Sequence, residues 1–292
     1  MASDSESTVR GRELGNAVRL AIERTDLTGK RLAELLDWSE TKVSRIVTGH
    51  VVPSEVELAS LLALCGVVGE QRGVLLALCR DQGLSDWSTN RSAVVRYQQA
   101  ALKITEFHNS LVPSLLQTES YARSVASRMA NVEDDDIESW LSTRQQARVV
   151  FDRMKSRAPI GTFFIHQLAL DLPVGGCEVI SDQLHHILRI SARRNISIRV
   201  VPAALGAHPG TCGPFCFMEF SDFRPIAHFE DEAEGHFIEE PAKIAKYQRM
   251  IAALSVISLS RTESTVAIRD KAALYSRQCE SGQVREPDSL SG

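Results

Sequence analysis

Apolar residues recur at helical spacing through the first quarter of the chain, and the pattern predicts five consecutive helices. They are expected over Arg12–Arg24, from Thr28, after Ser39, over Glu55–Cys65 and over Glu70–Arg80. In the first helix the inward positions share one face: Leu14, Ala17, Val18, Ala21 and Ile22. Apolar residues at i, i+3, i+4 and i+7 are typical of a helix that buries one stripe against a core. The pattern therefore predicts an all-α domain.

The second and third of these helices are joined by a tight turn within the stretch TGKRLAELLDWSETKVSRIVTG, which runs from Thr28 to Gly49. Thr28 and Ser39 are expected to be N-caps, because their hydroxyl groups can accept a hydrogen bond from an amide at a helix start. Asp37 stands where such a turn usually needs a left-handed residue, and Asp tolerates that conformation better than most non-glycine residues. The stretch predicts a helix-turn-helix.

The helix after Ser39 is polar on one side. Val43, Ile46 and Val47 fall on its apolar face, and the opposite face carries only donors and acceptors. Such a face suits the major groove of DNA, where base edges display a hydrogen-bond code. Thr41 and Arg45 are expected to contact base edges. Glu40, Lys42 and Ser44 are expected to flank them, and Ser39, the helix cap, completes the expected DNA-binding residues.

A phosphate contact is expected at the start of the preceding helix, from Thr28 and Lys30. Unpaired amides and the helix dipole favour an anion at that end. One short recognition helix contacts only a few base pairs, so useful specificity needs two half-sites. The sequence therefore predicts a homodimer on double-stranded DNA.

These features resemble the helix-turn-helix regulators of the XRE type, the phage Cro and repressor family. The matching positions are Ala33, Val43 and Ile46, and the segment SRIVTGHVVPS is similar to the family's S-R-x-E-x-G-x-x-x-P-S. Asp37 replaces the usual turn glycine, and Val47 stands where the family often has Glu. The resemblance covers about Arg12 to Arg80 and implies sequence-specific DNA binding.

Beyond Pro159 the period changes from helical to alternating. Short strands rich in Ile, Val and Phe are expected over 161–172, 196–201, 215–220 and 226–229. Helices are expected over 94–108, from 118, over 137–152, over 177–192 and, as the final helix, over 241–259. The order of these elements predicts an α+β domain.

The predicted organisation has five parts. Residues 1–10 are Ser-rich and acidic and are expected to be disordered. A five-helix helix-turn-helix domain covers 11–82, a helical connector covers 83–160, an α+β sensing or interaction domain covers 161–275, and 276–292 form a disordered tail. Around Trp87 the segment 82–91 is rich in turn-forming residues and is interpreted as a linker.

Charge agrees with this division. The formal net charge is −4, yet 8–50 hold eight Lys or Arg against six Asp or Glu, a local excess of +2. By contrast 224–240 hold one Arg and six acids. A basic excess on the helix-turn-helix is expected where DNA would lie, with salt-sensitive binding. The apolar runs are too short to span a bilayer and the N-terminus is polar, so a cytoplasmic protein without membrane contact is expected.

Several stretches of the second half are similar to a domain found behind helix-turn-helix modules in actinobacterial regulators, often described as antitoxin-like. They occur in the family's order: LVPSLLQTESYARSV, RQQARVV, LPVGG, IRVVPAALGAHPG with GPF after it, and the helix before Ser260. Ser114 stands where the family has Gly. The resemblance covers about Tyr97 to Ser260. It implies a small partner protein encoded nearby, rather than a chemical activity.

The sequence offers little catalytic or metal-binding chemistry. His208-x3-Cys212-x3-Cys216 has ligand types that suit Zn²⁺ but no fourth ligand at a recognisable spacing. No nucleophile elbow or phosphate loop is present. We therefore expect no catalytic residue, no metal, no cofactor and no enzyme. An alternative to control by a partner protein is a repressor gated by a small metabolite, in an apolar pocket lined by four aromatic residues: Phe163, Phe164, Phe215 and Phe217.

Overall fold

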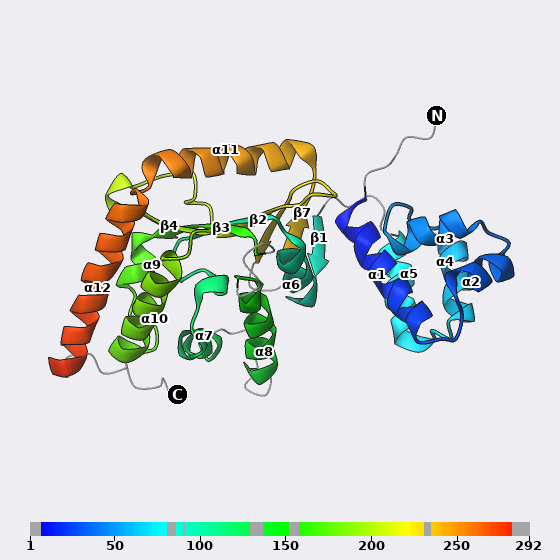
Figure 1. The fold of residues 1–292 in the computed structure, drawn as a ribbon, viewed down its shortest axis with the longest axis horizontal. Coiled ribbons are helices and arrows are strands. Elements are labelled where there is room, and N and C mark those ends of the chain that lie inside the picture. The colour runs from blue at the N-terminus through cyan, green and yellow to red at the C-terminus, as the bar shows by residue number, and fades with distance from the viewer. Residues whose placement is uncertain are drawn as a thin grey trace. The chain divides into compact units, whose positions relative to one another are not determined.

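The computed structural model describes residues 7–80, 86–89, 91–128, 137–151, 158–230 and 235–281. The chain forms two compact units, Met1–Trp87 with Asp222–Arg224 and Ser88–Ser221 with Pro225–Gly292. Figure 1 shows the elements of both. Each unit is described by itself below.

The N-terminal unit is built from five helices between residues 9 and 80. Its helices are α1 (Val9–Glu23), α2 (Gly29–Leu36), α3 (Glu40–Val47), α4 (Glu55–Leu64) and α5 (Gly69–Arg80). One apolar core joins all five: Leu14, Val18, Ala21, Leu32, Ile46, Leu58, Leu61, Leu62, Cys65, Val67, Leu75 and Cys79. The predicted all-α five-helix domain is confirmed.

The C-terminal unit is built on a mixed sheet with strand order β1-β7-β6-β5-β2-β3-β4. Its strands are β1 (Asp86–Thr89), β2 (Lys103–His108), β3 (Ile160–His166), β4 (Ile196–Val201), β5 (Phe215–Glu219), β6 (Ile226–Glu230) and β7 (Gly235–Ile238). Strands β2, β3 and β4 are parallel, and β2, β5, β6 and β7 pair antiparallel in turn. The predicted α+β class is confirmed.

Helices cover both faces of this sheet (Figure 1). Helix α11 (Pro241–Ile257) lies across one face, over an aromatic core of Phe107, Phe164, Phe215 and Phe217. On the other face lie α6 (Arg91–Ala100), α7 (Glu119–Ala126), α8 (Ile137–Arg148), α9 (Gln167–Asp171) and α10 (Gly176–Ser191). Three short 3-10 turns, η1 (Ser114–Leu116), η3 (Val149–Phe151) and η4 (Ala203–Leu205), and the long helix α12 (Arg261–Ser281) complete the described elements.

The helix predicted over 94–108 is wrong in its second half. Helix α6 ends at Ala100, and Lys103–His108 is β2, which pairs with β3 on one side and β5 on the other. Ile104, Thr105, Glu106 and Phe107 are all buried, because both faces of a central strand are covered. A strand buried on both faces does not alternate, so its pattern cannot be told from that of a helix.

Three further predictions need correction. The expected strand 161–172 stops at His166, whose Nδ1 accepts a hydrogen bond from the amide of Leu168 (3.2 Å) and so caps α9. The segment 86–89, expected to be linker, is β1. The helix before Ser260 is not the last, because α12 follows and continues to Ser281. Of the predicted disordered and linker segments, 1–6, 82–85, 90 and 282–292 lie outside the described residues, whereas 9–10 belong to α1 and 276–281 belong to α12.

In the described ranges, no single helix is long and apolar enough to cross a membrane. Helices α11 and α12, which meet at a bend of 73°, meet that length and composition criterion only when taken together.

Candidate nucleic-acid interface

The turn between α2 and α3 is closed by Asp37 in the left-handed conformation (φ 54°, ψ 43°). The amide of Trp38 donates to the carbonyl of Ala33 (2.8 Å), and the amide of Asp37 donates to the carbonyl of Glu34 (3.4 Å). This paired arrangement satisfies the last carbonyls of α2 and usually employs glycine. Asp37 is the one non-glycine residue with positive φ among those described. The predicted left-handed turn is confirmed.

Replacing Asp37 with glycine should stabilise the N-terminal unit. Glycine adopts positive φ without the steric cost of a Cβ atom, although it gains more entropy when the chain unfolds. The net gain should be about 0.5–1 kcal/mol. Urea unfolding of D37G measures it, with D37A as the control that keeps the strain. If D37G were no more stable than D37A, backbone strain at the turn would be excluded.

Helix α3 presents the predicted contact residues to solvent. Ser39 caps it, since its hydroxyl oxygen accepts from the amide of Lys42 at 3.2 Å. Val43 and Ile46 are 3% and 1% exposed and anchor the helix in the core. On the outer side Glu40, Thr41 and Ser44 are exposed, and Arg45 is half-buried. The polar side of α3 is therefore largely exposed on the surface of the N-terminal unit.

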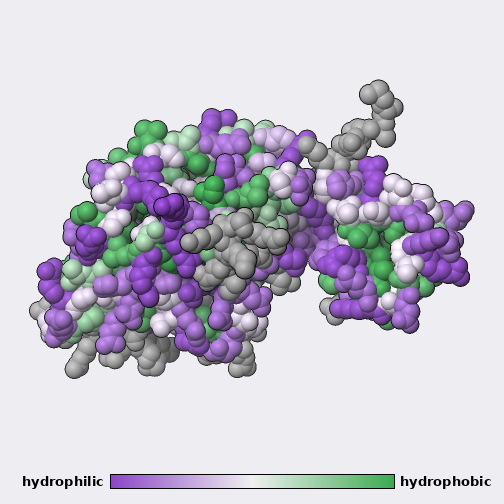
Figure 2. Space-filling model, viewed as in Figure 1, coloured by the Kyte–Doolittle hydropathy of each residue, from purple (hydrophilic) through white to green (hydrophobic). Residues whose placement is uncertain are grey.

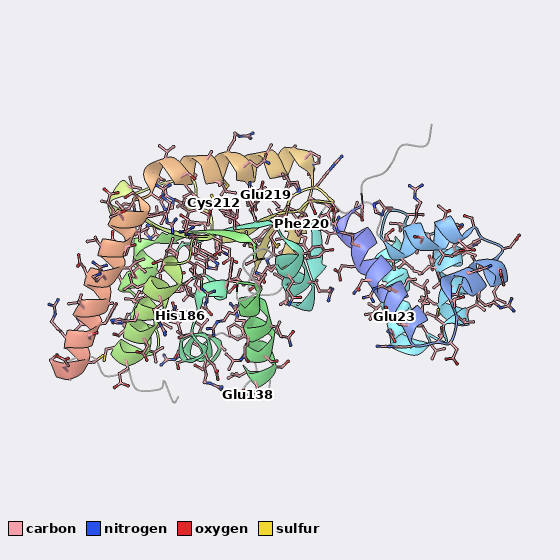
Figure 3. The ribbon with its side chains drawn as sticks, in the orientation of Figure 1. Glu23, Glu138, His186, Cys212, Glu219 and Phe220 are labelled. Carbon is pink, nitrogen blue, oxygen red and sulfur yellow. The ribbon has the colours of Figure 1, made fainter. Side chains whose placement is uncertain are left out.

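Lys30 lies beside the same helix. It lines a groove of about 340 Å³ between α1, α2 and α3, together with Arg19, Ile22, Glu23, Gly29, Glu40, Val43, Ser44 and Val47. Figure 2 shows apolar side chains in the middle of this unit with hydrophilic ones around them. Glu23, labelled in Figure 3 at the end of α1, pairs with Arg19 (2.5 Å). The structure thus brings Lys30 next to Glu40 and Ser44, and it adds Arg19, which the sequence analysis had missed.

Thr28 acts at the start of α2. Its Oγ1 accepts from the amide of Arg31 at 3.2 Å, as an N-cap does. The preceding amides, those of Gly29 and Lys30, belong to the first turn, where helical amides have no intrahelical acceptor. This helix end therefore has the geometry that binds phosphate in other proteins.

Lys42 differs from its predicted neighbours, because its half-buried ammonium group already has partners within the unit. It forms an ion pair with Glu57 of α4 and lies 4.3 Å from the centre of the Trp38 ring. Glu57 also accepts hydrogen bonds at Oε2 from the amide (2.8 Å) and the hydroxyl (2.9 Å) of Ser54. Lys42 therefore ties α3 to the first turn of α4.

The same contacts set the charge state of Glu57. The hydrogen bond from Lys42, and then those from Ser54, lower the pKa of Glu57 from 4.5 to about 2. A carboxylate with a lowered pKa in the folded state contributes stability above its unfolded pKa, and this is lost as pH falls through the folded pKa. The window of loss therefore lies between pH about 4.5 and about 2.

Replacing Glu57 with glutamine should lower the free energy of unfolding at pH 7 by about 0.5–1 kcal/mol, since the pair is partly exposed and screened. Below pH 4.5 the difference from the wild type should shrink, and near pH 2 it should close. Urea unfolding across this pH range provides the measurement. An E57Q deficit that stays constant down to pH 2 would show that the charge of Glu57 is not what stabilises the unit.

The crossing of α1 and α3 depends on glycines. A Cβ atom on Gly15 would lie 2.6 Å from the carbonyl oxygens of Ile46 and Val47, and one on Gly11 would lie 2.6 Å from that of Gly49. Gly49 itself has φ of 76° and ends α3. The backbones of the two helices thus touch, which fixes the direction of α3. The spacing of Gly11 and Gly15 on one helix face was the sequence signal that could have revealed this crossing.

The possible zinc ligands of the C-terminal unit do not converge. His208 stacks on His166 with ring centres 5.3 Å apart, Cys212 is exposed, and Cys216 is buried on β5. Over the described ranges, no group of three or more His, Cys, Asp or Glu is placed to hold a metal ion. The four phenylalanines considered as a pocket lining are buried in the protein interior: Phe163, Phe164, Phe215 and Phe217.

Comparison with known proteins agrees with the two units. Residues 13–75 match a family model described as a helix-turn-helix domain. Residues 91–270, more than half of the chain, match a model described as a domain of unknown function (DUF5753). No curated protein and no solved structure matches the chain.

Proposed function

Because the chain belongs to the DUF5753 family and carries a DNA-binding helix-turn-helix domain ahead of that family's domain, we propose that it is a sequence-specific transcriptional regulator of the XRE type. The observation that carries the proposal is the exposed polar side of α3, held by the Ser39 cap and by the buried Val43 and Ile46. A regulator, rather than an enzyme, is what such a domain indicates.

In the proposed complex α3 enters the major groove. Thr41 and Arg45 contact base edges, with Glu40 and Ser44 beside them. Thr28 and Lys30 hold a phosphate at the start of α2, where the amides and the dipole favour an anion.

We propose that Lys42 and Ser39 position α3 rather than contact base edges. The ammonium group of Lys42 already has the carboxylate of Glu57 as its partner, and the hydroxyl of Ser39 already accepts from an amide. Both residues hold the recognition helix in place, and any contact that they make with DNA lies at the edge of the protein–DNA interface. Their loss should therefore reduce stability along with DNA affinity.

The active species on DNA is proposed to be a homodimer. A helix of eight residues, as α3 is, reaches only a few base pairs. Two copies on half-sites about one helical turn apart give the contacts that a genomic site requires.

Selection from random duplexes followed by footprinting tests this proposal. The expected result is a paired site with two similar half-sites and a footprint that covers both. A single short half-site, bound by protein that light scattering shows to be monomeric, would contradict the dimer. Absence of any preferred sequence would contradict sequence-specific regulation altogether.

Control is proposed to come from a small partner protein, encoded nearby, that binds the C-terminal unit in an antitoxin-like pairing. The resemblance over 97–260 supports this, as does the acidic stretch 224–240, which suits a basic partner. A partner acts as a switch only if it binds the free and the DNA-bound regulator with different affinity. The test is to recover the partner on the full-length protein from its own cells, purify it, and measure operator affinity with and without it. Unchanged affinity would rule out this form of control.

A further inference from the structure

Helices α10 and α12 lie side by side in the C-terminal unit and run antiparallel (Figure 1). At one end of the pair Arg261, which begins α12, donates from its guanidinium group to the carbonyl of Ser191, which ends α10, at 3.3 Å. Toward the other end the hydroxyl groups of Ser181 and Ser276 are 3.0 Å apart. Because serine side chains are short, the two backbones are close to each other at this contact.

The same pairing places two cysteines opposite each other, one turn beyond these serines. Cys177 lies four residues before Ser181, and Cys279 lies three residues after Ser276, so both stay on the facing sides of the two helices. The two thiol groups are in hydrogen-bond contact with each other. A disulfide requires Cα atoms within about 7 Å, and helices joined by a direct contact of two serines can meet this requirement.

The two cysteines are free thiols that differ in exposure. Cys177 is 9% exposed, in the first turn of α10, and Cys279 is half-buried, in the last turn of α12. Partial burial, the hydrogen bond with Cys177 and the negative charge of Glu178 raise the pKa of Cys279 to about 11. Since the thiolate is the form that attacks an oxidant, oxidation should be slow near pH 7 and should require sustained exposure.

We propose that Cys177 and Cys279 form a reversible disulfide when the protein is exposed to a peroxide. The sulfur of Cys279, the more accessible of the two, attacks one peroxide oxygen. The O–O bond breaks, one water leaves with the thiol proton, and Cys279 becomes a sulfenic acid. Cys177 then attacks that sulfur, so that the S–S bond forms and the S–O bond breaks. The hydroxide leaves with the proton of Cys177 as a second water, and the peroxide has accepted two electrons from the two sulfur atoms.

This disulfide would fasten the last turn of α12 to the first turn of α10. It closes a loop of about 100 residues, and a cross-link of that length restricts the unfolded chain strongly. The melting temperature of the C-terminal unit should therefore rise by about 5 °C or more on oxidation. The bond lies within the C-terminal unit and does not depend on DNA binding, so the inference goes beyond the proposed regulator function.

Prolonged incubation of the full-length protein with hydrogen peroxide, followed by tryptic mass mapping without reductant, tests the proposal. The expected product is the peptide 158–189, which contains Cys177, joined to the peptide 278–285, which contains Cys279. Its mass should be lower than that of the two separate peptides by two hydrogen atoms, and dithiothreitol should separate them. The linked protein should migrate as a single chain on a non-reducing gel.

Variants of single cysteines provide the controls. C279S and C177A should each abolish the linked peptide and the rise in melting temperature, and melting under reducing conditions shows that both variants are folded. Cys212, labelled in Figure 3, is exposed and gives the matched control, since C212S should keep both effects. The proposal would be overturned if peroxide oxidised Cys212 but left 158–189 and 278–285 unlinked. It would also be overturned if Cys279 became a sulfinic acid without a bridge, or if the linkage occurred only between two chains.

Discussion

Replacing Gly15 with alanine is expected to lower the free energy of unfolding of the N-terminal unit by about 2 kcal/mol or more. The new Cβ atom would lie 2.6 Å from two carbonyl oxygens of α3 and 2.9 Å from the amide nitrogen of Gly49. These are backbone atoms, so no side chain can rotate away and the two helices must separate. Alanine gains about 1 kcal/mol in helix propensity over glycine, which the overlap outweighs.

Gly73 provides the matched control. It lies within α5, and a Cβ atom built there meets nothing within 4 Å. G73A should therefore stabilise the unit by up to about 1 kcal/mol, the opposite sign to G15A. Urea unfolding followed by circular dichroism measures both. Equal effects in the two variants would show that the contact of α1 with α3 is not close in solution.

The same contact links stability to function. Helix α3 is held at its end by the glycine crossing with α1, in its middle by Val43 and Ile46, and near its start by the pair of Lys42 and Glu57. G15A moves only the first of these anchors. We therefore expect G15A to lose operator affinity even at temperatures where it remains folded, because the recognition helix changes direction.

The helix-turn-helix was predictable because its signals are local. Thr28 and Ser39 accept from amides three residues ahead, and Asp37 shapes a turn of a few residues. The pair of Lys42 and Glu57 was not predictable, since its members are fifteen residues apart and meet only when α3 packs near α4. The polar pattern of α3 in the sequence therefore did not reveal that Lys42 is paired within the unit.

The C-terminal unit was predictable in class and less so in detail. Strand β2 was hidden because a strand buried on both faces loses its alternation. Helix α12 was missed because it buries only a narrow stripe of small and mixed residues: Ser264, Ile268, Ala272 and Tyr275.

Replacing Arg45 with alanine is expected to cost about 1–3 kcal/mol on the operator and to relax the preference at one base pair. Arg45 lies on the outer side of α3, one turn after Thr41, where a guanidinium group can reach a base edge. Replacing Lys30 should lower DNA affinity without changing the preference for any base pair. K30A should weaken all duplexes alike and reduce the slope of log affinity against log salt by about one, because one phosphate contact is lost.

Competition binding on the selected operator and on a scrambled duplex separates the two effects. Arg31 gives the control, because it is exposed on α2 and pairs with Glu34 at 2.9 Å, so R31A should change neither the preference nor more than a fraction of the salt slope. Thermal unfolding of each variant confirms that the unit remains folded, which matters most for the half-buried Arg45. If R45A lost the same affinity on both duplexes, Arg45 would be a phosphate contact, and reading of the base edges would fall to Thr41 and its neighbours on α3.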